Sequence, residues 1–224
     1  MIVADLVAVL LLATLVGIWL SGRIGLCRSF ALYLALAMVT NRLARWWPDR
    51  FFNMSFFSVK ELVLAALSVV IVLELAWSGL ASFPRARRIS LWCVSAIALA
   101  GAAVVLSTSG ARDYKTQIGV LVAGGQLCAL VTLVVFLAVV QWYRLPLRPW
   151  HRAIAVGFLL YRGVYGVVLG VLGHYGGPTY AFVAELDRAA YAATVGLWGF
   201  AAWRAEWYDL AAEARIRARA LQRS

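Results

Sequence analysis

Three charged side chains interrupt an apolar stretch that is long enough to cross a membrane. Glu185, Asp187 and Arg188 lie within residues 179–204, where most other side chains are alanine, aliphatic or aromatic. A charge at bilayer depth costs free energy unless it faces the bundle interior, water or an opposite charge, so these residues are candidates for a site. Glu185 and Arg188 are three apart and can pair along one helix face, whereas Asp187 points elsewhere and needs a different partner.

Other polar side chains interrupt two further apolar stretches. Arg162 lies near the middle of one of them, and we predict that it forms a bidentate arginine–carboxylate pair with Asp187 on the next helix. Lys60 and Glu74 are close to four helical turns apart, so they share a helix face that we expect to look into the bundle. The full candidate set, a buried polar cluster or ligand-binding site, comprises Lys60, Glu61, Glu74, Tyr161, Arg162, Tyr165, His174, Glu185, Asp187 and Arg188.

The cluster has two main interpretations. Charge pairs between helices can fix packing and register with no ligand involved, or the same charges can line a cavity that binds a small molecule. Acid–base catalysis by Glu185 and His174 is a third and weaker alternative, because the two residues are separated by a helix end, so we favour binding over catalysis. His151 and His174 lie at opposite ends of one predicted helix, so we expect no metal, haem or other cofactor.

The composition is that of a membrane protein. The chain has 224 residues, of which 64% are hydrophobic and 14% charged, and several apolar runs reach the roughly 18 residues that cross a bilayer. The first run lacks a positive start, so we interpret it as a transmembrane helix and not as a cleaved signal peptide. The predicted fold is an all-α polytopic bundle with seven transmembrane helices, at residues 3–20, 27–44, 56–79, 89–107, 116–143, 152–174 and 179–204. Residues 1–206 form the predicted transmembrane domain, and residues 207–224 form a short basic cytoplasmic helical tail.

The positive charges predict the orientation. The net charge is +11, and the arginines lie in short loops between apolar runs, as topology determinants do, which excludes nucleic acid as a partner. With the N-terminus outside, thirteen basic residues lie on the inner side, namely Arg23, Arg28, Arg85, Arg87, Arg88, Arg144, Arg148, Arg152, Arg204, Arg215, Arg217, Arg219 and Arg223. Five lie in the outer loops, namely Arg42, Arg45, Arg50, Arg112 and Lys115. The positive-inside rule therefore favours an N-terminus outside and a C-terminus inside. We expect the protein in a bacterial inner membrane, where these two sides are the periplasm and the cytoplasm.

Tryptophans agree with this orientation. Eight of them lie near predicted inner helix ends, where an indole can straddle the apolar and polar layers. They are Trp19, Trp77, Trp92, Trp142, Trp150, Trp198, Trp203 and Trp207.

An internal repeat is a further prediction. When the sequence is shifted by 124 residues, the first three predicted helices align with the last three, and Arg28 falls opposite Arg152 and Glu61 opposite Glu185. The units are residues 1–80 and 116–204, with a linking helix at 89–107, and both run in the same direction. This parallel 3+1+3 arrangement resembles the architecture of the sugar-transporting SWEET proteins, which implies a substrate site between the two triplets. The Pro-Gln pair of the PQ-loop relatives of those transporters is absent from this sequence.

Two segments carry a family resemblance. SFFSVKELVLAALSVVIVLELAW and RLPLRPWHRAIAVGFLLYRGVYGVV are similar to a loose group of uncharacterised bacterial seven-transmembrane inner-membrane proteins, a likeness that implies the fold and no activity. Microbial rhodopsins also have seven helices, but they hold retinal on a lysine of the last helix. The lysines here are Lys60 and Lys115, so retinal attachment in the seventh helix is excluded.

The functional expectation follows from the deep charges and the repeat. We predict a small-molecule transporter, or a ligand sensor without its own output domain, whose polar cluster lies on the third, sixth and seventh helices. The alternative is a non-enzymatic accessory or assembly subunit of a membrane protein complex. The expected partners are the lipid bilayer, a small-molecule ligand, and other membrane proteins or a second copy of the chain.

Overall fold

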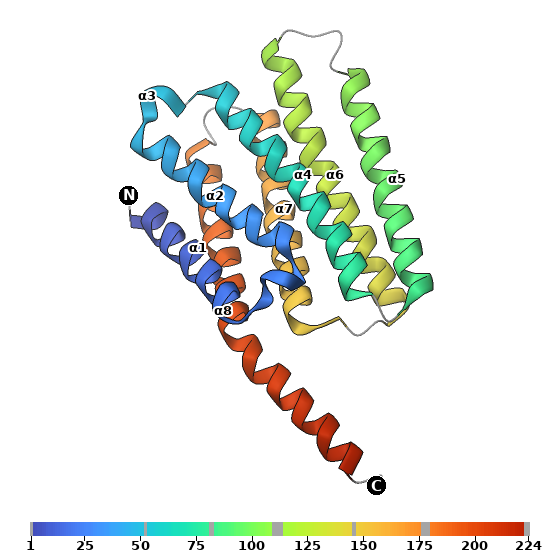
Figure 1. Ribbon diagram of the computed structural model, residues 1–224. Coiled ribbons are helices and arrows are strands. Elements are labelled where there is room, and N and C mark those ends of the chain that lie inside the picture. Colours follow the sequence, from blue (N-terminus) through green and yellow to red (C-terminus); the bar gives the residue numbers. More distant parts are fainter. Residues whose placement is uncertain are drawn as a thin grey trace.

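The computed structural model describes residues 2–51, 53–80, 83–108, 114–144, 147–175 and 180–221. Within these ranges, the side chains that are not described are those of residues 2–4, 23, 26, 54, 104–106, 108, 114–121, 169–170, 172–175, 180 and 205–221. The elements are α1 (Ile2–Leu20), η1 (Arg23–Leu26), α2 (Arg28–Trp46), α3 (Pro48–Phe51), α4 (Met54–Gly79), α5 (Pro84–Thr108), α6 (Tyr114–Trp142), α7 (Pro149–Tyr175) and α8 (Tyr180–Leu221). Figure 1 shows how these helices are arranged.

The predicted all-α class is confirmed, because the described ranges contain helices and no strand. The seven longer helices overlap the seven predicted spans. Three of them have described segments that are long and apolar enough to cross a bilayer, namely Ser55–Gly79, Pro84–Ala103 and Val122–Trp142, and α1 contains the shorter apolar helix Asp5–Leu20. By length and composition, therefore, the chain has at least three membrane-length helices.

The outer surface of the bundle is rich in large apolar side chains. Val9 on α1, Leu99 on α5 and Phe182 on α8 are 61%, 72% and 74% exposed, and many aliphatic neighbours on the other long helices are also exposed. A protein that folds in water seldom exposes apolar side chains over so many elements. This surface is suited to contact with lipid.

Local sequence explains where several helices begin. Pro48, Pro84 and Pro149 are the first residues of α3, α5 and α7, a position where the missing N–H costs nothing because it would have no partner inside the helix. Asn53 caps α4, because its side-chain oxygen accepts a hydrogen bond from the Phe56 backbone N–H at 2.8 Å. Gly22 has a φ of 65°, which suits a glycine in the turn between α1 and η1.

Helix α4 is the centre of the arrangement. It packs against α2, α5, α6 and α7, while α8 packs against α1 and α7, and α1 also contacts α2. In Figure 1, α5 and α6 stand on one side of α4, and α1, α2 and α8 stand on the other. Side chains from α4 therefore reach both halves of the bundle.

The most deeply buried aromatic group joins α2, α7 and α8. Trp198 lies edge-on to Phe30, with ring centroids 5.0 Å apart, and is tilted against Phe158 at 4.8 Å. Tyr33 contacts Phe158 at 4.9 Å, and Trp150 contacts Phe30 at 5.7 Å. These T-shaped and tilted contacts are the preferred aromatic geometries, so the cluster is a fixed part of the core.

Two tryptophans therefore differ from the expectation that all eight lie at an interface. Trp150 and Trp198 are 3% and 0% exposed, because they face α2 and not the surface. The side chain of Trp207 lies outside the described residues. The five that are exposed near the predicted inner ends of their helices are Trp19, Trp77, Trp92, Trp142 and Trp203.

Helix α8 is the longest element. It runs without a break from Tyr180 to Leu221, so residues 207–221 of the predicted tail continue the last long helix. Figure 1 shows its C-terminal part, in red, projecting beyond the other helices.

Candidate ligand-binding site

Arg162 on α7 is the centre of a buried polar network. The residue is 3% exposed, and its guanidinium donates from Nη2 to Ser68 Oγ at 2.8 Å and to the Leu64 carbonyl at 3.2 Å. Its Nη1 donates to the side-chain oxygen of Gln126 on α6. One N–H, at Nε, is buried and has no hydrogen-bond partner. Arg162 therefore joins α4, α6 and α7, and its Nε has no hydrogen-bond partner.

Gln126 connects Arg162 to a carboxylate. Its amide nitrogen donates to Glu61 Oε2 at 3.0 Å, while its amide oxygen accepts from Arg162. Glu61 Oε1 lies 3.4 Å from Lys60 Nζ, and Lys60 Nζ also donates to Asn41 Oδ1 at 3.2 Å. This chain of contacts extends the network from α7 through α6 and α4 to α2.

The spacing on α4 explains why it holds so much of the network. Lys60, Leu64 and Ser68 are four residues apart in turn, so they lie along one side of the helix, with Glu61 beside them. Ser68 Oγ also donates to the Leu64 carbonyl at 2.7 Å. The Ser68 hydroxyl oxygen and the Leu64 carbonyl oxygen thus lie close together, and both accept hydrogen bonds from the guanidinium.

A cavity of about 160 Å³ lies beside this network. Tyrosine rings form much of its wall: Tyr161 is 6.0 Å from Tyr165 and 5.1 Å from Tyr191 between centroids, and Arg162 Cζ is 5.8 Å from the Tyr161 centroid. The lining comes from α2, α4, α7 and α8, and comprises Tyr33, Ala37, Asn41, Phe57, Lys60, Glu61, Leu64, Tyr161, Arg162, Tyr165, Asp187, Arg188 and Tyr191.

The predicted pair between Arg162 and Asp187 is wrong. No ion pair or hydrogen bond joins them, because the Nη atoms of Arg162 are bound to groups on α4 and α6. Asp187 lines the cavity from α8, and its Oδ1 is buried without a hydrogen-bond partner. The two opposite charges thus share a cavity without contacting one another.

The predicted pair on α8 is confirmed. Arg188 Nη1 donates to Glu185 Oε1, but the two side chains are 59% and 66% exposed. Arg188 belongs to the cavity lining, whereas Glu185 does not. Glu185 therefore belongs to the surface and not to the buried group.

Glu74 is separate from the cluster. Its carboxylate accepts hydrogen bonds from the backbone N–H groups of Arg28 and Ser29 at 2.8 and 2.9 Å, and from the Ser29 hydroxyl. It thus caps the N-terminus of α2, four turns away from Lys60, which contacts α2 near its other end. The shared face of Lys60 and Glu74 is confirmed, and it looks toward α2.

The side chain of His174 lies outside the described residues. Tyr33, Asn41, Ser68 and Gln126 belong to the network or the cavity although the sequence reasoning did not select them. The signal for Gln126 was an amide inside an apolar span, which is costly without a partner; a tyrosine or serine in such a span gives a much weaker signal.

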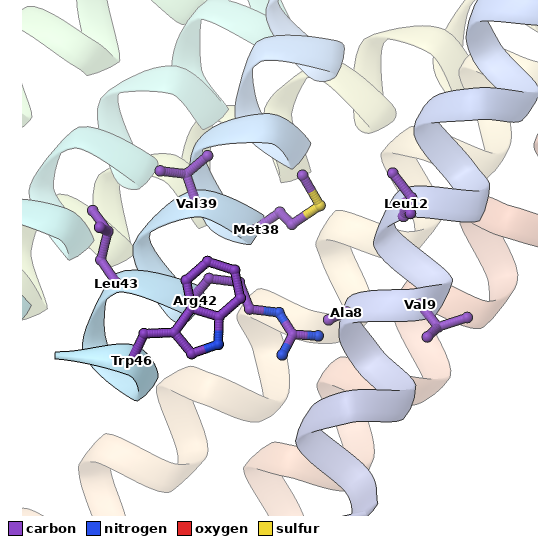
Figure 2. Close-up of a pocket in the computed structure, with 8 residues that line it drawn as sticks. All are labelled: Ala8, Val9, Leu12, Met38, Val39, Arg42, Leu43 and Trp46. Carbon is purple, nitrogen blue, oxygen red and sulfur yellow. The ribbon is translucent and has the colours of Figure 1, made fainter. Parts of the chain in front are cut away.

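A second hollow, of about 360 Å³, is of another kind. It is a groove between α1 and α2, lined by Ala8, Val9, Leu12, Met38, Val39, Arg42, Leu43 and Trp46, which Figure 2 shows as sticks. Its one charged lining residue, Arg42, pairs with Asp5 at 3.2 Å, and Val9, Leu12 and Trp46 are exposed. An apolar, outward-facing groove of this kind is ordinary for a surface in contact with lipid.

Within the part of the chain that the structure describes, no three His, Cys, Asp or Glu side chains gather as metal ligands. Comparison with protein-family models, with curated proteins and with solved structures finds no match to this chain. The function is therefore inferred from the residues and their geometry alone.

Proposed function

We propose that this chain is a multi-pass inner-membrane protein that binds a small polar ligand in the tyrosine-lined cavity beside Arg162. The observation that supports it is the state of Arg162: the residue is 3% exposed, has no carboxylate within ion-pair distance among the described residues, and leaves Nε without a partner. A purely structural arginine in low dielectric is best compensated by a bidentate carboxylate. Here Arg162 lines a cavity instead of pairing with a carboxylate.

The packing of the helices supports a carrier. The contacts α1–α2, α2–α4 and α1–α8 have counterparts in α6–α7, α7–α8 and α6–α4, as an exchange of the two proposed triplets requires. Helix α5, the proposed linking helix, packs against α4 and α6. The cavity receives Tyr33 and Lys60 from the first triplet and Arg162 and Asp187 from the second, so it lies between them. Carriers with internal repeats bind their substrates at such an interface.

Thermal unfolding of the purified protein with a panel of small polar solutes tests the binding. Carboxylates, amines, amino acids and sugars are added one at a time, and at least one class is expected to raise Tm, since a ligand at one hundred times its Kd stabilises by about 2.7 kcal/mol. Arg162→Gln should abolish that increase. Arg152→Gln is the matched control, because Arg152 is an exposed arginine on the same helix.

If no solute raises Tm of the wild type, and Arg162→Gln merely lowers it, Arg162 is a clamp between helices and the proposal fails. Uptake of the stabilising solute into proteoliposomes then separates the two forms of the proposal: a transporter accumulates it, whereas a sensor binds it without uptake.

An accessory subunit is the second candidate, and one observation favours it. Helix α8 continues to Leu221, beyond the rest of the bundle, and its last turns contain Arg215, Arg217 and Arg219. A projecting basic helix is suited to contact an acidic protein surface. Purification in mild detergent tests this: a stoichiometric partner protein that is lost when the chain is truncated after Arg204 favours the subunit, and its absence from the full chain counts against it.

A further inference from the structure

Two oppositely charged residues that line one cavity, Arg162 and Asp187, each have a buried polar atom without a hydrogen-bond partner. Arg162 Nε is a donor on a cation, and Asp187 Oδ1 is an acceptor on an anion, and both atoms are buried without a partner. A buried polar atom that lacks a partner costs about 1–3 kcal/mol, and more when its group is charged.

The other charges around the cavity already have partners. Lys60 is 3.4 Å from Glu61, and Arg188 is bonded to Glu185. Gln126 stands between Arg162 and Glu61 and separates their charges. Arg162 and Asp187 are therefore the two lining residues whose charges have no direct ion-pair partner among the described residues.

The charge balance restricts the kind of ligand. An anion would compensate Arg162 and leave Asp187 alone, a cation would do the reverse, and a neutral molecule would compensate neither. A molecule with both charges compensates both, and it brings no net charge into the bundle, where a lone charge is expensive.

Four tyrosines also line the cavity. Tyr191 lies one turn after Asp187 on α8, and Tyr161 packs on Tyr191 with centroids 5.1 Å apart, so aromatic rings lie close to the carboxylate. An ammonium group gains from the face of a tyrosine ring, and the phenol oxygens provide hydrogen bonds. The cavity, about 160 Å³, is smaller than the roughly 300–1,000 Å³ of drug-sized sites, which limits the ligand to a few heavy atoms.

We infer that the ligand is a small zwitterionic amino acid, whose carboxylate binds Arg162 and whose ammonium group binds Asp187 among the tyrosine rings. This inference rests on the proposed function, because it assigns the chemistry of the same cavity. In this assignment, Asp187 on α8 is the residue that gives the site its preference for ligands with an amino group.

Alanine and two analogues that each lack one of its charged groups, propionate and ethylamine, test the inference by titration of the purified protein. Alanine has both charges, propionate has the carboxylate alone, and ethylamine has the ammonium alone. Alanine should bind at least about tenfold more tightly than either analogue, since each lost charge-assisted hydrogen bond weakens binding by about that factor or more. Asp187→Asn should remove the preference for alanine over propionate, while Glu185→Gln, the exposed carboxylate two residues away, should keep it.

The contrary outcomes distinguish the two proposals. If propionate binds the wild type as tightly as alanine, and Arg162→Lys weakens both, the cavity is a ligand site but the zwitterion is wrong. If Asp187→Asn keeps the full preference for alanine, Asp187 is not the selecting residue and the inference is overturned. If none of the three solutes binds, the inference also fails, and the wider solute panel alone decides the proposed function.

Discussion

At the scale of single residues, Gln126 connects the arginine and the glutamate of the buried network. It is 4% exposed, its oxygen accepts from Arg162, and its nitrogen donates to Glu61. The amide is neutral, so it separates a cation from an anion without adding a charge. This explains how the bundle can hold Arg162 and Glu61 without a direct ion pair between them.

Gln126→Leu should therefore destabilise the protein strongly. The leucine fills nearly the same volume, but it leaves one charged donor and one charged acceptor without a partner, each at a cost of about 1–3 kcal/mol. Thermal unfolding in detergent measures the loss. Gln141→Leu is the control, because Gln141 is an exposed glutamine on the same helix. Equal Tm values for the two variants would contradict the role of Gln126.

Glu74 provides a second prediction at this scale. Its carboxylate caps α2 from another helix, through two backbone N–H groups and the Ser29 hydroxyl. Glu74→Ala should lower stability by about 2 kcal/mol, because the cap and its charge-assisted bonds are lost together. Glu185→Ala should change stability far less, since that carboxylate is 66% exposed in a surface pair. A Tm for Glu74→Ala at or above that of Glu185→Ala would count against the capping role.

At the scale of elements, the contact between α7 and α8 depends on one glycine. A methyl group at Gly157 would lie 2.8 Å from Cε2 of the Trp198 ring and would also clash with its Nε1. Trp198 is fully buried among the rings of Phe30 and Phe158 and cannot move aside easily. Gly163 and Gly166, by contrast, face open space, so the glycines of this helix do not share one packing role.

Gly157→Ala should therefore destabilise the bundle, whereas Gly163→Ala should not. Overpacking of a filled core costs about 1–3 kcal/mol. In the open position, alanine should be neutral or stabilise by up to about 1 kcal/mol, because it restricts the unfolded chain and favours the helix. Comparison of the two Tm values measures the difference. If both variants behave alike, the close approach of α7 to Trp198 is wrong.

At the scale of the whole molecule, the predicted orientation can be tested with introduced cysteines. Asp49 on α3 and Arg148 before α7 are both exposed, and the predicted topology places them on opposite sides of the membrane. In a variant without Cys27, Cys93 and Cys128, a membrane-impermeant maleimide should label Asp49→Cys in intact bacterial cells. Arg148→Cys should react only after permeabilisation.

Two outcomes would correct this picture. The reversed pattern would place the N-terminus in the cytoplasm, against the charge distribution. Labelling of both cysteines in intact cells would mean that the helices between them do not separate two compartments. The test therefore addresses the orientation and the multi-pass nature together.

Sequence alone determined the helices and the surfaces that suit a membrane. Long apolar runs, prolines at helix starts and the charges between the runs are local properties, and local hydropathy and backbone chemistry set them before any packing occurs. The pair of Glu185 and Arg188 and the shared face of Lys60 and Glu74 were also predictable, because the helical repeat alone fixes which residues of one helix are neighbours.

Only the tertiary structure decided which polar residues meet. The partner of Arg162 depends on how α4, α6, α7 and α8 are rotated against one another, and aromatic packing around Trp198 helps to set that rotation. Hydropathy and helical spacing contain no information about rotation between helices. For that reason Glu74 and Glu185 were predicted in the cluster but lie outside the buried network. Gln126 and Ser68 were not predicted but belong to that network. For the same reason Arg162 and Asp187, predicted as a pair, face a common cavity instead.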